Sequence, residues 1–385
     1  MIQILDIRVF RPLTEYTTLE QNQIGKIQAS RVRFTEDLYN AGDWSMELSG
    51  YQAGAESLRQ GNLVLFRSDR LALWGIVRGI SDDSAGMGIS VLRTGDDLKG
   101  YLKQRICLYP RGGDVEGFDT VRGSTETVMK HYVQNNLVSP ANALRAIPKF
   151  TVAPDRGRGA ADDKYMARFN KLTDLLSEVG QAQKLGYAVG MDIASGTMVF
   201  DVIEGADRTA GQSEAPRIIF DVNLRTAASS RFVSDLESYR NAFYTTKSGA
   251  RTEAEATTLL YFREGEEEPA GAGRYETQIS VSVDDTAADI AGEMQNLARK
   301  EMTNFEKDDT FTIELNGSFV YGRDFFLGDF VTVQDRMMQI QEEVQLISVT
   351  HEWSGIGYRV TGTFGKPRKT NLELLERQIR TEGGR

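Results

Sequence analysis

The chain has 385 residues, of which 40% are hydrophobic and 26% charged, a composition typical of a globular protein with roughly two to four domains. A net charge of −10 argues against a protein that grips nucleic acid or an anionic membrane, because both need clustered Lys and Arg. The one cysteine, Cys107, excludes an internal disulfide. No run approaches about 18 apolar residues and charge interrupts the N-terminus early, so we expect folding in a cytoplasm without membrane insertion.

Residues 1–105 predict a first small β-barrel. Residues 2–10 alternate apolar and polar side chains as a strand, and residues 29–34 form a second such run. Further alternating runs with Gly and Asp turns follow to about Thr94.

The pattern becomes partly helical in residues 106–225, for which we expect an α+β insert. Ser124 is placed to cap a helix that ends before Ser139-Pro140, and residues 169–179 carry apolar side chains at helical spacing. A hairpin over residues 187–202, turned at Ser195-Gly196, follows.

Residues 226–366 predict a second β-barrel, with strands at residues 238–245, 256–263 and 275–283 and a helix at residues 286–303. The acidic turn at residues 264–268 lacks calcium-loop spacing and is expected to be a solvated loop. Residues 367–385 form a tail in which Thr370 and Glu373 fit a capping box. Its apolar stripe, a candidate for docking a partner, consists of Leu372, Leu375 and Ile379.

The two predicted barrels resemble each other residue by residue. At an offset of 267, residues 311–315 fall on residues 44–48, Gly328 falls on Gly61 and Val331 falls on Val64. The same offset matches Val344, Ile347 and Ser348 to Val77, Ile80 and Ser81, and the register then slips by two at the next hairpin turn. The predicted fold is therefore a β-rich α+β class with two similar small barrels, an insert between them and a short C-terminal helix.

Motifs for chemistry are absent from the sequence. His131 and His351 lie 220 residues apart without metal-ligand spacing, and a Cys107 nucleophile would need a base that only the fold could supply. We therefore predict no catalytic residue, no cofactor-binding residue, no metal and no enzyme. A glycosidase with paired carboxylates stays open as an alternative, because its geometry is not visible in a sequence.

The chain resembles the tail-hub family of long-tailed bacteriophages, which comprises the baseplate hub and the N-terminal part of siphophage tail-associated proteins. The resemblance runs along nearly the whole chain and depends on the order of several segments rather than on one motif. These segments are residues 123–133, 168–176, 205–209, 239–241, 327–333 and 363–365.

This resemblance implies a structural virion protein at the tail tip, made in the host cytoplasm. A homotrimer would present six barrels in a pseudo-hexameric ring, adapting the sixfold tail tube and distal tail proteins above to threefold tip or fibre proteins below. DNA would pass transiently through the ring during genome ejection without specific binding. The alternatives are a cell-wall hydrolase of the tail tip, with its carboxylates in the insert, and a spike or adaptor of a contractile secretion system.

Overall fold

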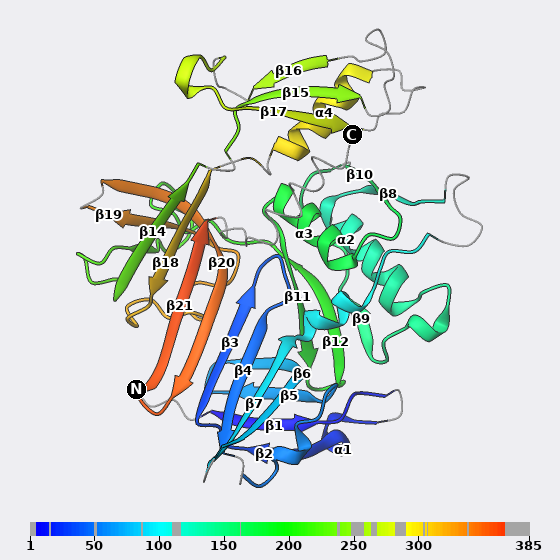
Figure 1. Ribbon diagram of the computed structural model, residues 1–385, viewed down its shortest axis with the longest axis vertical. Helices are drawn as coiled ribbons and strands as arrows, with labels where there is room; N and C mark the ends of the chain where they lie inside the picture. Colours follow the sequence, from blue (N-terminus) through cyan, green and yellow to red (C-terminus); the bar gives the residue numbers. More distant parts are fainter. Residues whose placement is uncertain are drawn as a thin grey trace. The chain divides into compact units, whose positions relative to one another are not determined.

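The computed structural model describes residues 5–365 except 15–16, 50–51, 86–87, 110–116, 162, 237–238, 248–257, 263–267, 282–289, 303–304, 306 and 337–338. These residues divide into two compact units, the first drawn from Met1–Arg231 and Thr312–Phe364 and the second from Phe232–Phe311 and Gly365–Arg385. One large, mainly antiparallel sheet dominates the first unit (Figure 1). The predicted β-rich class is therefore confirmed.

The first repeat has the strand order β3-β4-β7-β6-β5-β1, with β2 beyond β1, and all of its neighbours are antiparallel. Side chains alternate between its faces, so that Val32 and Phe34 are buried while their neighbours are not. Its strands are β1 (Asp6–Phe10), β2 (Gln23–Ile27), β3 (Arg31–Asp37), β4 (Asp43–Ser49), β5 (Leu63–Arg67), β6 (Ala72–Ala85) and β7 (Gly88–Asp97), with the short helices α1 (Leu19–Asn22) and η1 (Ala55–Ser57).

Six strands near the other end of the chain repeat this order as β14-β18-β21-β20-β19-β13. The last pair differs, because β13 and β19 are parallel whereas β1 and β5 are antiparallel. Closure of either repeat into a barrel stays a prediction. The strands are β13 (Ile219–Phe220), β14 (Ser229–Asp235), β18 (Asp308–Glu314), β19 (Phe330–Asp335), β20 (Ile340–Ser354) and β21 (Gly357–Gly365).

Matching hydrogen bonds fix which residues of the two repeats are equivalent. The backbone N–H of Gly61 donates to the Val77 carbonyl at 2.8 Å, and that of Gly328 donates to the Leu346 carbonyl at 2.9 Å. Gly61 and Gly328 both have left-handed backbones, with φ of 86° and 95°, which favour glycine. The offset is thus 267 at the glycines but 269 on the following strands.

The predicted match of Val344, Ile347 and Ser348 to Val77, Ile80 and Ser81 is therefore wrong. Val331 pairs with Val344 where Val64 pairs with Gly75, so these three residues correspond to Gly75, Arg78 and Gly79. A register shift interrupts both strands at the same place, between Val77 and Gly79 and between Leu346 and Ser348. The two extra residues lie in the β19–β20 hairpin. A shift of two residues leaves every side chain on the same face of the sheet, so the alternation of apolar and polar residues in the sequence could not reveal this shift.

β14 is the counterpart of β3 at a third offset, 198. Arg33, Phe34, Asp37 and Leu38 recur as Arg231, Phe232, Asp235 and Leu236. The backbone agrees, because the N–H of residue 30 donates to the carbonyl of residue 47 at 2.9 Å and that of residue 228 donates to the carbonyl of residue 314 at 2.8 Å. The sequence analysis missed β14, since it placed residues 226–237 outside any strand.

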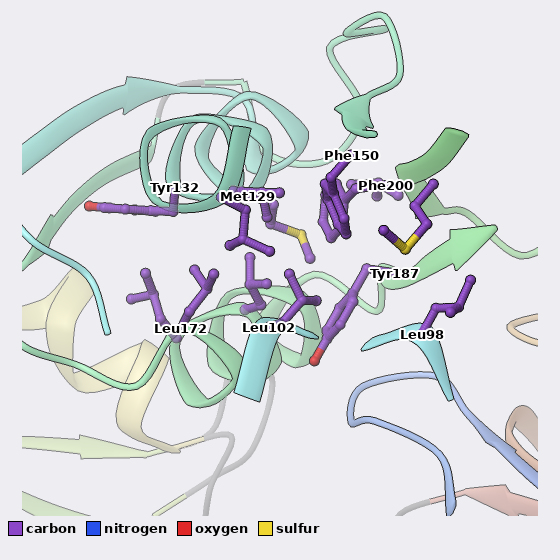
Figure 2. Packing of buried hydrophobic residues seen from close by; sticks show 14 of the residues in the cluster. Leu98, Leu102, Met129, Tyr132, Phe150, Leu172, Tyr187 and Phe200 are labelled. Carbon is purple, nitrogen blue, oxygen red and sulfur yellow. The ribbon is translucent and has the colours of Figure 1, made fainter. Parts of the chain in front are cut away.

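The α+β insert shares the large apolar cluster shown in Figure 2 with strands β1, β5 and β6 of the first repeat, and in this cluster Tyr132 and Met129 of α2 face Leu172 of α3. The predicted cap is confirmed, because the Ser124 Oγ accepts the Thr127 N–H at 3.1 Å, and so is the hairpin, which Asp192 and Thr197 close. The elements are η2 (Leu98–Gln104), β8 (Asp119–Gly123), α2 (Thr125–Val133), η3 (Gln134–Val138), η4 (Ala143–Arg145), β9 (Phe150–Val152), β10 (Asp163–Ala167), α3 (Leu172–Ala182), β11 (Gly186–Asp192) and β12 (Thr197–Ile203).

The second unit runs in the chain from within β14 to within β18, and the residues between these two strands take the place of residues 38–42 between β3 and β4 of the first repeat. It contains β15 (Ala242–Lys247), β16 (Thr258–Phe262), β17 (Glu276–Val281), η5 (Gly271–Gly273) and α4 (Ile290–Met302). Phe243 and Ile279 of the sheet pack with Met294 and Ala298 of α4. The predicted helix at residues 286–303 is confirmed over α4, and the acidic turn lies mostly outside the described residues.

Candidate functional site

The two repeats meet along β3 and β20. These strands pair antiparallel over seven residue pairs, from Asp37 with Ser348 to Arg31 with Ser354, so β3 has a partner on each edge. Trp353 of β20 joins the buried cluster of the first repeat. The second repeat thus completes both the sheet and the apolar core of the first, which makes this junction the site that most directly links the two halves of the chain.

His351 lies at the centre of the junction and is fully buried. Its Nε2 is 2.9 Å from Oε1 of Glu36 on β3, and its Nδ1 is 2.8 Å from the hydroxyl of Tyr358 on β21. The ring also stacks on Trp353 and Tyr358. Both nitrogens therefore have partners, and the histidine connects three strands from the two repeats. Its place in a strand is as predicted.

Two tyrosines near His351 keep their protons firmly. Burial raises the pKa of Tyr321, and the nearby Glu36 carboxylate adds to the effect. Burial and Glu36 likewise raise the pKa of Tyr358. Phenols that stay protonated act as hydrogen-bond donors here and not as bases, so the cluster is suited to holding the strands together.

A charged hollow of about 400 Å³ opens beside the junction. In its lining, Nε of Arg31 donates to Oε1 of Glu352 at 2.8 Å, and Arg359 Nε is 3.0 Å from Oε1 of Glu314. Because these charges already pair with one another, they leave little charge for a ligand to neutralise. The exposed Ile356, in the β20–β21 turn, also lines the hollow.

The insert contains a buried ion-pair network around Glu126 of α2. Lys130 Nζ donates to its Oε1 at 2.6 Å, and the Arg158 guanidinium donates to both carboxylate oxygens at 2.9 Å. Burial alone would raise the pKa of Glu126, but the hydrogen bonds from Arg158 and Lys130 outweigh it and hold the pKa well below its usual range. Glu126 is therefore ionised near neutral pH and is unsuited to act as a general acid. Asp201 completes the network, 2.8 Å from Lys130.

The other residues considered for chemistry are spread over the first unit. His131 lies on α2, as predicted, with Nε2 2.8 Å from Oδ1 of Asp119. Cys107 is buried, which raises the pKa of its thiol to about 12. Within the described ranges, no three His, Cys, Asp or Glu side chains gather as a metal site, and no helix has the length and apolarity to cross a membrane.

The predicted docking residues Leu372, Leu375 and Ile379 lie outside the described residues. Conversely, sequence reasoning did not identify the β3–β20 junction or the pair of Glu36 and His351, which are 315 residues apart. One signal could have pointed to it, namely the recurrence of residues 33–38 at residues 231–236, because it marks two copies of the strand that makes this junction.

A family of Siphovirus ReqiPepy6 Gp37-like proteins matches residues 8–366. The chain belongs to this family. No curated protein matches this Gp37-like chain. The resemblance to phage tail proteins drawn from the sequence is confirmed, and the family match supports a structural role in a phage tail.

Solved structures share the fold at low sequence identity. The 43 kDa tail protein of prophage MuSo2 from Shewanella oneidensis is 14% identical with a TM-score of 0.59, over 94% of this chain and 98% of that one. Prophage tail protein gp18 from Listeria monocytogenes is 12% identical with a TM-score of 0.53, over 98% and 99%. A chain of the Francisella PdpA-VgrG complex is 10% identical with a TM-score of 0.50, over 96% of this chain and 60% of that one.

Proposed function

We propose that the chain is a hub of the phage tail tip, a homotrimer whose six repeats form a pseudo-hexameric ring. The ring adapts the sixfold tail tube and distal tail proteins to threefold tip or fibre proteins, within the virion. Its role is positional, and its affinity comes from broad interfaces rather than from a catalytic pocket.

The observation that carries this proposal is the repeated strand order. β3-β4-β7-β6-β5-β1 recurs as β14-β18-β21-β20-β19-β13, and the two copies are joined edge to edge by β3 and β20. In a trimer, a chain with two equivalent repeats can face six identical subunits on one side and three on the other. This supports a division of the chain into barrels at residues 1–105 and 226–366, an insert at 106–225 and a tail at 367–385.

Charge and sequence support two further parts of the proposal. A net charge of −10 suits a ring through which DNA passes during ejection, since a channel that bound phosphate would hold the genome back. Leu372, Leu375 and Ile379 of the predicted tail helix are proposed to dock the next tip component, by burying their apolar stripe.

The mass of the purified chain in solution tests the hub proposal. Light scattering over a concentration series should give about 129 kDa, three times the chain mass of 42.9 kDa, because the ring requires three copies. If the protein stays monomeric on its own, tube protein is added and the mass measured again. A monomer under both conditions would overturn the trimeric hub.

A spike or adaptor of a contractile secretion system is the second candidate, supported by the similarity to a chain of the Francisella PdpA-VgrG complex. Neighbouring genes separate the two functions. Genes for tube and tape-measure proteins favour a phage hub, and genes for toxin and immunity proteins favour secretion. A cell-wall hydrolase would instead release soluble fragments from purified walls, an activity that one Asp→Ala or Glu→Ala change should abolish.

A further inference from the structure

One strand edge is covered in the second repeat and open in the first. Residues Ser348–Ser354 of β20 lie between β21 and β3, which pair with its two edges. The equivalent stretch of β6, at offset 269, is residues 79–85. Within the described part of the chain, this stretch pairs with β7 on one side and has no ladder partner on the other.

The strand that could fill this open edge is also present in the chain. β3 covers β20, and β14 is the counterpart of β3. β14 ends the order of the large sheet, with β18 as its neighbour among the described strands. Each chain therefore has one filled contact of this type, which is the pairing of β3 with β20. It also has the two halves of an unfilled contact, which are the open edge on β6 and the strand β14.

Exposed apolar side chains mark both halves of the unfilled contact. In the filled contact, Val349 of β20 and Leu38 after β3 are fully buried, and the Leu38 N–H donates to the Ile347 carbonyl at 2.8 Å. Their counterparts Ile80 and Leu236 are each 44% exposed. The two positions that are buried in the β3–β20 contact are thus partly exposed where β14 and residues 79–85 have no such partner, and pairing of these two strands would bury both.

The register of the filled contact also gives complementary charges in the open one. Arg33 lies opposite Glu352 in the β3–β20 ladder. The ion pair of Glu352 itself is with Arg31, so what recurs is the ladder position. The same register on the open edge sets Arg231 opposite Asp83 in the ladder. Directly opposed residues of unlike charge stabilise an antiparallel pair, and a mismatch of register would lose this.

We propose that β14 of one copy pairs antiparallel with residues 79–85 of β6 in the next copy, placing Ser234 opposite Ile80 and Arg231 opposite Asp83. The inference rests on the trimer proposed above and names the surfaces that close it. Each copy donates one strand and accepts one, which is a head-to-tail contact that forms a ring when the rotation closes. Alternating with the contact inside each chain, it links all six repeats through one kind of junction.

Cysteine cross-linking between copies tests this register. An Ile80→Cys chain and a Ser234→Cys chain with different tags are co-expressed, purified together, oxidised and run on a non-reducing gel. The expected result is a covalent pair carrying both tags, and the double variant should give a covalent species of three chains. Ile80→Cys with Leu144→Cys, an exposed position on η4, is the matched control and should stay uncrosslinked. The native Cys107 is buried and common to all.

The outcomes separate this inference from the hub proposal. A trimer by light scattering without the cross-link overturns the strand pairing and leaves the trimer standing. A monomer under all conditions overturns both. As a second test, Arg231→Glu or Asp83→Arg alone should weaken association by about tenfold over the three contacts of the ring, and co-assembly of the two reversed chains should restore it. If the two reversed chains together associate as weakly as either one alone, the proposed register is contradicted.

Discussion

The two repeats build the same strand order around different cores. In the first, the indole of Trp44 packs over Gly75 and Gly95, where a Cβ on Gly95 would lie 1.9 Å from the Ile76 carbonyl oxygen. In the second, the positions equivalent to Trp44 and Gly95 hold Phe311 and Phe364. A large residue facing glycine is thus replaced by two of medium size. The strand order is the same in both repeats, but the side-chain volume is divided differently between the two paired strands. This is expected when packing constrains the total volume of the core rather than the size of each residue.

Truncating a fully buried aromatic side chain in each repeat should have the greatest effect. Trp44→Ala and Phe364→Ala each remove a buried aromatic side chain and should each lower the free energy of unfolding by about 3–5 kcal/mol. Urea denaturation measures both. If each repeat has a complete core, the two variants should lose similar amounts of unfolding free energy. A loss below about 1 kcal/mol in one variant would show that its repeat is not independently packed.

Besides its large apolar cluster, the insert between the repeats contains a buried ion-pair network. Glu126→Ala leaves Lys130 and Arg158 buried without their partner and should cost about 3–5 kcal/mol. Chemical denaturation at neutral pH measures this loss. Glu126→Gln is the isosteric comparison, since it removes the charge with little change in volume.

The same network predicts a pH dependence. The hydrogen bonds from Arg158 and Lys130 hold the folded-state pKa of Glu126 below its unfolded value of about 4.5. Its contribution to stability is therefore fully present above the unfolded pKa and is lost as pH falls through the folded pKa. Unfolding curves between neutral and acid pH should fall less steeply for Glu126→Gln than for the native chain. Parallel curves would contradict the role given to this carboxylate.

Breaking the polar centre of the junction should have an intermediate effect. His351→Phe keeps an aromatic ring but removes the hydrogen bonds to Glu36 and Tyr358, at a cost of about 1–3 kcal/mol. Glu36→Gln keeps an oxygen acceptor for the His351 N–H and should lose less. A Gln variant as damaged as the Phe variant would argue against the hydrogen bond as the cause.

The smallest effect is expected at the rim of the junction. The Arg31 and Glu352 side chains are partly exposed and their attraction is screened by solvent, so Arg31→Ala should destabilise the chain less than any of the changes above. High salt should screen the pair and reduce the difference between variant and native chain. A loss comparable to that of His351→Phe would mean that the rim, and not the buried centre, holds the repeats together.

Local patterns predicted much of this fold, because alternation, capping and turn residues act over short stretches. The Ser124 cap and the hairpin closed by Asp192 and Thr197 are examples. The junction of β3 and β20 has no local signal, since its residues are more than 300 positions apart in the chain. β14 was missed because the second unit separates it from β18, which changes the repeat offset from 267 to 198.

The most direct test of the central claim is a cryo-electron microscopy reconstruction of the assembled tail tip, calculated without imposed symmetry. We expect three copies of the chain around a central channel, with six similar sheets alternating between the first and second repeats. A ring of six copies, or a single copy attached outside the channel, would contradict it, because the duplicated repeat would then have no role in matching sixfold to threefold symmetry.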